Sequence, residues 1–338
     1  MVMKWLIEIL MAMNLIQPTD FKLESDMKIG LSYQPGTVEA QSFIEDLNVK
    51  YVHRGVSWYW GERVKGLYRW DLIDPRMDVY EESGCKFTAT IGLSAFPPWD
   101  YTIEDFENFF RAYLERYQGR IHQISLGNEW FVQSHRTNIK TPEEYTQYNN
   151  LLYDLVQEIC PEVKVVLSAF CFGTIFDYAS CQKGWTEELR DNSKYLSQFY
   201  TLEELLERCE NFEALNNKVT YVVNHCNFDR VDIHLYDDYE NWHHYFDMVR
   251  GYFPNKEIIC TEWGGPNYTF ENNGDIFQAD RMVKYFKALD KCDFAEVYYF
   301  KMYQEKEIGG HSRVGMIEEN SKEPRLAYYI FKEFNKNR

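Results

Sequence analysis

Two glutamates in this sequence each stand at the end of an apolar, strand-like run and are each followed by tryptophan. Glu129 ends the run 124–129, and Glu262 ends the run 257–262. A carboxylate at the end of a buried strand costs desolvation free energy unless it is paired or used chemically. The strand-like runs and their spacing suggest that both acids lie at one mouth of a barrel. Paired carboxylates at such a mouth are the chemistry of glycoside hydrolysis.

The elements that must position these acids are strands that alternate with helices from residue 28 onward. The predicted strands are Lys28–Ser32, Lys50–Val56, Lys86–Gly92, Ile121–Gly127, Lys164–Ala169, Arg230–Leu235, Glu257–Thr261 and Ala295–Lys301. Apolar strands alternating with amphipathic helices are typical of a parallel sheet that is covered on its outer side. Eight such units predict an α/β fold of the (β/α)8 TIM barrel type, as a single domain over 28–338 with an insertion at about 170–228. The sequence has no GxGxxG or GxxxxGK[ST] motif, which argues against a nucleotide-binding doubly wound sheet.

Polar side chains on two other strands are predicted to support the acids. Period-two alternation along the sixth strand puts Asp232, His234 and Tyr236 on one face, which we interpret as the barrel interior. Tyr236 then lies where its hydroxyl can donate to the carboxylate on the seventh strand. On the second strand we predict that Arg54 points inward, where Glu262 is the obvious partner and its pKa would be lowered.

At this point the sequence resembles the clan A glycoside hydrolases, a superfamily of retaining (β/α)8 enzymes that includes β-xylosidase and cellulase-like families. The matching residues are Arg54, Asn128, Glu129, His234, Tyr236 and Glu262. The resemblance implies that Glu262 is the nucleophile and Glu129 the acid/base of a double displacement on β-glycosidic bonds. Glu129 then needs a raised pKa, which Trp130 and a dry cleft would supply. The resemblance also implies that Asn128 bonds the sugar 2-hydroxyl and that no metal or organic cofactor is required.

Aromatic residues make up 17% of the chain, and some of them are expected to stack on sugar rings. The candidate platforms are Trp58, Trp60, Trp99 and Trp263. Many clan members carry a tryptophan at the end of strand eight, where this sequence has Phe300 and Tyr303 as substitutes. Lys301, with His311 and Arg313 in the following loop, suggests an acidic sugar such as a uronate; the alternative is loop charges that face water.

Composition limits the partners. The net charge is −17, which disfavours nucleic acid and anionic membranes as partners. The resemblance to glycoside hydrolases implies a carbohydrate substrate. The eight cysteines show no CxxC spacing, and we interpret them as reduced, buried thiols rather than a disulfide framework or zinc site, with a Cys171–Cys181 bridge as the less favoured alternative.

Residues 1–27 are predicted to be a short N-terminal helix or a weak signal-like segment. The acidic, cysteine-bearing body favours the cytoplasm, whereas the apolar first sixteen residues leave secretion open. The sugar, the linkage, exo or endo action, the family within the clan and the oligomeric state stay open.

Two other functions compete with hydrolysis. A metal-dependent barrel isomerase or lyase that acts on sugars would use His234 and Glu262 as ligands, but the other strand ends show no obvious further ligands. A non-catalytic carbohydrate-binding barrel would bind sugar without hydrolysis.

Overall fold

The computed structural model describes residues 21–32, 37–94, 96–265, 274–304, 314–318 and 320–336. Predicted features within residues 1–20, together with His311 and Arg313, lie outside this part of the chain. Among the described helices, none is long and apolar enough to cross a membrane.

Eight parallel strands close into a barrel in sequence order, with β1 paired to both β2 and β8. They are β1 Lys28–Ser32, β2 Tyr51–Val56, β3 Lys86–Ile91, β4 Ile121–Leu126, β5 Lys164–Phe170, β6 Arg230–Tyr236, β7 Glu257–Gly264 and β8 Glu296–Tyr299. The predicted (β/α)8 fold and all eight predicted strands are therefore confirmed, with ends that differ by at most three residues. A short pair of strands, β9 Tyr303–Gln304 and β10 Ile317–Glu318, follows β8.

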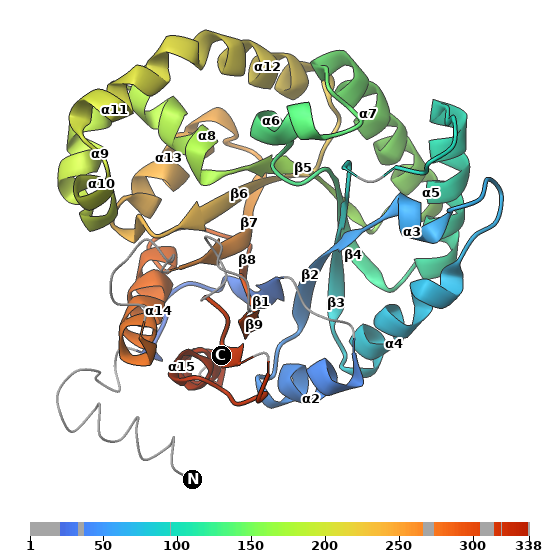
Figure 1. Ribbon diagram of the computed structural model, residues 1–338, viewed down its shortest axis with the longest axis horizontal. Helices are drawn as coiled ribbons and strands as arrows, with labels where there is room; N and C mark the ends of the chain where they lie inside the picture. Colours follow the sequence, from blue (N-terminus) through green and yellow to red (C-terminus); the bar gives the residue numbers. More distant parts are fainter. Residues whose placement is uncertain are drawn as a thin grey trace.

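Helices form a ring around the barrel, as Figure 1 shows. The longer ones are α2 Val38–Asp46, α4 Asp74–Glu82, α5 Ile103–Tyr117, α7 Pro142–Ile159, α12 Phe212–His225, α13 Trp242–Tyr252, α14 Asp275–Leu289 and α15 Leu326–Lys336. α5 carries an apolar stripe from Phe106 to Tyr117 that is fully buried against its neighbours. Thr141 caps α7 through a reciprocal bond with Glu144, which forms a capping box.

The short helices lie in the loops that follow the strands. They are α3 Trp58–Gly61, η2 Trp70–Leu72, α6 Trp130–Gln133, η3 Ser134–Arg136 and η6 Tyr239–Asn241. The insertion between β5 and β6 holds α8 Phe172–Asp177, η4 Tyr178–Gln182, α9 Thr186–Asn192, α10 Lys194–Phe199, α11 Leu202–Glu207 and η5 Arg208–Asn211. Thr201 caps α11, with its side chain accepting from the Glu204 backbone N–H.

One disulfide ties this insertion together. Cys181 in η4 bonds to Cys209 in η5, so the prediction that all cysteines are reduced is wrong, and the alternative partner Cys171 is a free thiol. Pairing depends on the distance between two Cα atoms, here 5.2 Å, which the spacing of 28 residues in the sequence does not reveal. The cysteines therefore no longer support the cytoplasmic assignment.

A buried ionic cluster fills the end of the barrel where the strands begin. Glu296 accepts hydrogen bonds from Arg230 Nη1 at 2.9 Å and from Tyr298 at 2.6 Å, and its carboxylate lies 2.7 Å from His122 Nε2. Gln123 donates to the same carboxylate at 3.2 Å. Burial raises the pKa of Glu296, but these neighbours more than offset burial and lower it to about 2.

Replacing Glu296 by glutamine is expected to reduce the free energy of unfolding by about 3–5 kcal/mol at pH 7, because the buried Arg230 loses its buried carboxylate partner and keeps the exposed Glu257. The folded pKa lies below the ordinary value of 4.5, so the stabilisation is present above that value and is lost as the pH falls towards 2. Urea titrations from pH 7 to pH 3 should therefore show the two proteins converging. Glu257→Gln is the control: Glu257 also pairs with Arg230, but its side chain is 57% exposed, and a loss of less than about 1 kcal/mol is expected. Equal losses in both variants would contradict this account.

Candidate active site

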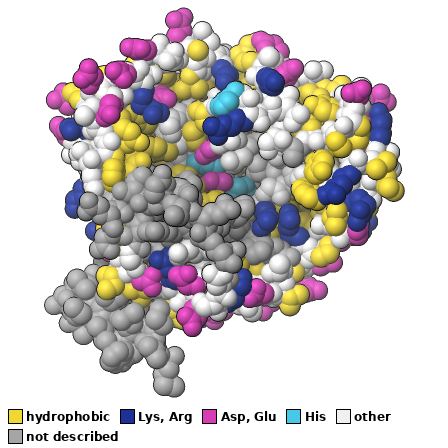
Figure 2. All heavy atoms as spheres, viewed as in Figure 1, with side chains coloured by type: hydrophobic (Ala, Val, Ile, Leu, Met, Phe, Trp, Pro, Cys, Tyr) yellow, Lys and Arg dark blue, Asp and Glu magenta, His cyan; other side chains and the backbone are white. Residues whose placement is uncertain are grey.

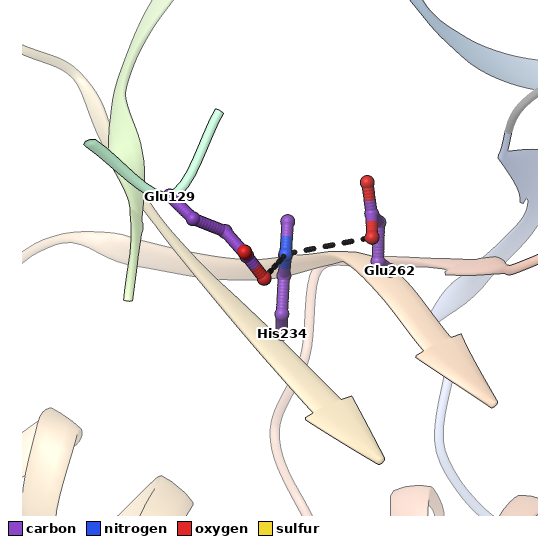
Figure 3. A group of neighbouring side chains, drawn as sticks. All are labelled: Glu129, His234 and Glu262. Carbon is purple, nitrogen blue, oxygen red and sulfur yellow. Dashed lines mark hydrogen bonds and ion pairs between the residues drawn. The ribbon is translucent and has the colours of Figure 1, made fainter. Parts of the chain in front are cut away.

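Glu129 and Glu262 lie together at the mouth where the strands end, one on each side of His234 (Figure 3). His234 Nδ1 is 2.9 Å from Glu129 Oε1 and 3.6 Å from Glu262 Oε2. One oxygen of each carboxylate and a ring nitrogen of His234 all lie within 4.8 Å of one another. The two acids that the sequence singles out are thus neighbours in space. In Figure 2, histidine and acidic side chains are visible at the bottom of a hollow near the middle of the face.

The backbone turns sharply at Glu129. This residue adopts a left-handed conformation, with φ of 47° and ψ of 38°, directly before α6. Such a conformation costs a non-glycine residue about 1 kcal/mol or more and is common at functional sites. Gln133, one helical turn later, donates to Glu129 Oε2 at 2.6 Å. The spacing of four residues was the signal that could have identified Gln133 from the sequence.

The face of β6 that carries Asp232, His234 and Tyr236 points into the barrel, as predicted. Tyr236 donates to Glu262 Oε2 at 2.6 Å, which confirms the predicted hydrogen bond. Asp232 accepts from the backbone N–H and the hydroxyl of Thr261. Asp232 therefore fixes the strand segment immediately before Glu262, a role that we did not predict.

The Thr261 hydroxyl determines which nitrogen of His234 carries a proton. Since that hydroxyl donates to Asp232, its oxygen accepts from His234 Nε2, 3.0 Å away. His234 Nδ1 and Glu129 Oε1 therefore share a single proton, which is on one partner or the other. Burial lowers the pKa of His234, but Glu262, Asp232 and Glu129 together raise it well above its usual value.

A second interior histidine, His53, shows how the pKa of a buried imidazole behaves without carboxylate neighbours. The ring nitrogens of His53 are hydrogen-bonded to two neutral hydroxyls, of Ser32 at 2.8 Å and of Thr90 at 2.8 Å. Burial, with the nearby charge of His234, lowers its pKa to about 3. His53 is therefore neutral where His234 favours the charged form, and the carboxylates around His234 account for the difference.

The expected low pKa of Glu262 is wrong. Burial raises it, His234 and the Tyr236 hydroxyl lower it, and the negative charge of Glu129 raises it, with a net shift above the ordinary value. The repulsion between Glu129 and Glu262 disappears when one of the two carries a proton. The site is consequently most favourable with one carboxylate ionised and the other protonated.

Arg54 is not on the inner face, so the predicted pair with Glu262 is also wrong. Arg54 shares its face of β2 with Val52 and Val56, which pack outward against the helices, and the inner face of β2 carries His53 instead. Arg54 lies on the outer side of β2, where it lines a cavity with Met77 of α4.

The four tryptophans predicted as sugar platforms differ in how far they are exposed to solvent. Trp58 and Trp263 are completely buried in the core, as is Trp130, whose ring stacks on Tyr145 instead of enclosing Glu129. Trp99 is partly buried with its ring against Trp58. Trp60 is 53% exposed and is the remaining candidate of the four.

Beyond β8, Phe300 is the residue near the acids. Its ring centroid lies 6.3 Å from that of Tyr236, whereas Tyr303 packs against Phe43 of α2. Lys301 is buried, with its ammonium 5.3 Å from the Phe300 ring, so it does not face water. Asn128 is exposed beside Glu129 at the rim.

Replacing Tyr236 by phenylalanine is expected to lower kcat/KM on the order of 10²-fold, because it removes the hydroxyl that orients Glu262. Since this hydroxyl lowers the pKa of Glu262, the acid limb of the pH–rate profile should move to higher pH. Tyr252 lies on the outer face of α13, so Tyr252→Phe should leave both kcat/KM and the acid limb of the pH–rate profile unchanged. An unshifted acid limb in the Tyr236 variant would contradict this role.

A (β/α)8 barrel with paired carboxylates at the carboxyl ends of its fourth and seventh strands defines the structural class of this protein. Among solved structures, the same fold is found in an exo-β-1,4-mannosidase from Opitutaceae bacterium strain TAV5, with 14% identity, a TM-score of 0.60 and coverage of 92% of this chain and 59% of that one. A family 39 glycoside hydrolase from Bacteroides cellulosilyticus WH2 shares 13% identity and a TM-score of 0.61, over 94% and 64% of the two chains. A β-glucosidase from Exiguobacterium marinum shares 12% identity and a TM-score of 0.62, over 94% and 99%.

This chain thus spans less than two thirds of the mannosidase and of the family 39 enzyme. No protein-family model and no curated protein matches the sequence. At these identities the likeness establishes the fold, which agrees with the resemblance seen in the sequence.

Proposed function

We propose that this protein is a retaining glycoside hydrolase that cleaves β-glycosidic bonds by double displacement. The observation that carries the proposal is the placement of Glu129 and Glu262 around His234, with carboxylate oxygens within 4.8 Å. Retaining enzymes hold their two carboxyl groups about 5–5.5 Å apart, whereas inverting enzymes need a wider gap for a water molecule. The fold shared with a β-mannosidase and a β-glucosidase supports a β-linked substrate.

The proposed roles follow from the hydrogen bonds. Glu262 attacks the anomeric carbon as a carboxylate, held by the Tyr236 hydroxyl and with the ring of His234 3.6 Å from its Oε2. Glu129 protonates the leaving oxygen and afterwards removes a proton from the attacking water. When the proton that Glu129 shares with His234 is on Glu129, it is the proton that the leaving oxygen receives. The proposed steps use no metal or organic cofactor.

A panel of aryl β-glycosides, uronides included, tests the proposal, with proton NMR of the first-formed anomer. We expect hydrolysis of at least one member and a β-configured first product. An α-configured first product would overturn the retaining mechanism. Sugar binding without hydrolysis would indicate the non-catalytic carbohydrate-binding barrel instead.

The metal-dependent isomerase or lyase remains the second candidate, because Glu129, His234 and Glu262 together offer a nitrogen and two oxygens to a cation. A metal must compete with a proton for His234, whose pKa is raised well above its usual value, and this competition weakens the candidate. Full activity after treatment with EDTA would exclude this reaction class, whereas loss of activity that added metal restores would favour it.

A further inference from the structure

A cavity of about 530 Å³ lies beside the mouth, between the sheet and the helices that follow β2 and β3. Its upper wall is formed by Gly55–Ser57, at the end of β2, and by Gly92 and Ser94, directly after β3. These are strand ends at the same face of the barrel as Glu129 and Glu262. This part of the cavity wall therefore lies on the face of the barrel at which substrate would bind.

Positive charge is concentrated in this cavity, although the chain as a whole carries −17. Arg54 from β2 and Arg76 from α4 both line it, and its described lining includes no aspartate or glutamate. Arg76 donates to the Gly55 carbonyl at 3.3 Å, and within the described part of the chain it has no carboxylate partner. In Figure 2, Lys and Arg side chains are seen beside the central hollow.

A buried hydroxyl in the cavity wall also has no partner among the described residues. Tyr113 of α5 is fully buried and lines the cavity, yet its Oη makes no hydrogen bond. An unpaired buried hydroxyl costs about 1–3 kcal/mol unless a ligand or water bonds to it. Burial raises the pKa of Tyr113, and the charge of Arg76 lies near enough to oppose this effect. A donor and a guanidinium thus face the same space.

The rim of the cavity carries an apolar surface suited to a sugar ring. Trp60 and Leu72 line the cavity and are 53% and 43% exposed, and Val64 and Leu67 in the same loop are 60% and 58% exposed. The Arg63 guanidinium lies 3.9 Å from the centroid of the Trp60 ring. An exposed indole next to guanidinium groups offers stacking and charge together.

We propose that this cavity binds the carboxylate of an acidic sugar, with Arg76 and Arg54 supplying the charge, Tyr113 donating a hydrogen bond and Trp60 stacking on the ring. The proposal deepens the proposed function, since it assigns a uronate-bearing carbohydrate as the substrate class. It also replaces the acidic-sugar site predicted around Lys301, which is buried behind Phe300.

Isothermal titration of the full chain with D-glucuronate, with its uncharged methyl ester and with sodium sulfate tests the proposal without requiring hydrolysis. We expect glucuronate to bind at least about tenfold more tightly than the ester, because bonds to charged groups contribute about 1.5–3 kcal/mol. Arg76→Gln should remove this preference, and Tyr113→Phe should weaken it without altering the affinity for the ester. Arg69→Gln, which removes one positive charge from the same loop but outside the cavity, should leave it unchanged.

Equal affinity for glucuronate and its ester, or a preference that survives both variants, would overturn the proposal. Binding of sulfate alone would overturn the assignment to a sugar. Thermal melts would check that each variant is folded. If Arg76→Gln does not fold, Tyr113→Phe still tests the proposal, because it deletes only one unpaired atom. Arg76-dependent glucuronate binding with no activity on any aryl glycoside would refute the proposed hydrolysis while supporting this site.

Discussion

The Glu262→Gln variant is expected to lose activity on aryl β-glycosides on the order of 10⁵-fold in kcat, with the fold intact. Loss of a covalent nucleophile removes a group whose bond to the substrate defines the reaction path, and comparable deletions cost about 10⁶-fold. Glutamine keeps the shape of the side chain and accepts the Tyr236 hydrogen bond. The substitution therefore mainly removes the nucleophilic character of the group at position 262. Steady-state rates measured with unchanged circular dichroism and melting temperature would establish this result.

Glu257→Gln is the matched control, because Glu257 begins the same strand at the opposite end of the barrel and its side chain is 57% exposed. It should retain full activity. Residual activity of a few per cent or more in Glu262→Gln, once contamination by wild-type protein is excluded, would place the nucleophile elsewhere.

The second large effect is expected from Glu129→Ala, and its size should depend on the leaving group. For a glycoside with a poor leaving group, loss of the general acid should lower kcat/KM by about 10²–10⁴-fold. A dinitrophenyl glycoside needs no protonation to depart, so its kcat/KM should fall far less. A plot of log kcat/KM against leaving-group pKa should therefore steepen relative to the wild type.

The control for this experiment is Glu143→Ala, at an exposed position in the first turn of α7. Its plot should match that of the wild type. If Glu129→Ala lost the same factor on every leaving group, Glu129 would not act as the acid, and the shared proton with His234 would need another explanation.

The barrel could be predicted from the sequence because its signals are local. Apolar strands and amphipathic helices alternate eight times, and each pattern depends only on nearby residues. The inward face of β6 followed from the alternation of Asp232, His234 and Tyr236. The same rule gave the wrong face for Arg54, because we did not weigh the flanking valines, Val52 and Val56, as evidence for the helix-covered side.

Other features depend on contacts between distant residues and could not be read from the sequence. The partner of Cys181 is 28 residues away, and its identity depends on how the insertion packs. Trp58 lies just after β2 and Trp263 near the end of β7, where an exposed platform would also lie, but the surrounding rings bury them completely. The raised pKa of Glu262 reflects its burial and the nearby charge of Glu129, and both depend on the closed barrel.

The ionic cluster around Glu296 limits the path by which a substrate could enter the site and a product could leave it. Arg230, Gln123 and Tyr298 join Glu296 in closing the far end of the barrel, and His53 with Thr90 fills the interior above them. In the proposed hydrolysis, substrate, the attacking water and both products would therefore pass through the opening above Glu129 and Glu262. The released sugar would then have to leave through this opening before the next carbohydrate molecule can enter. Product that stays bound in the opening would therefore slow every later turnover of the proposed reaction.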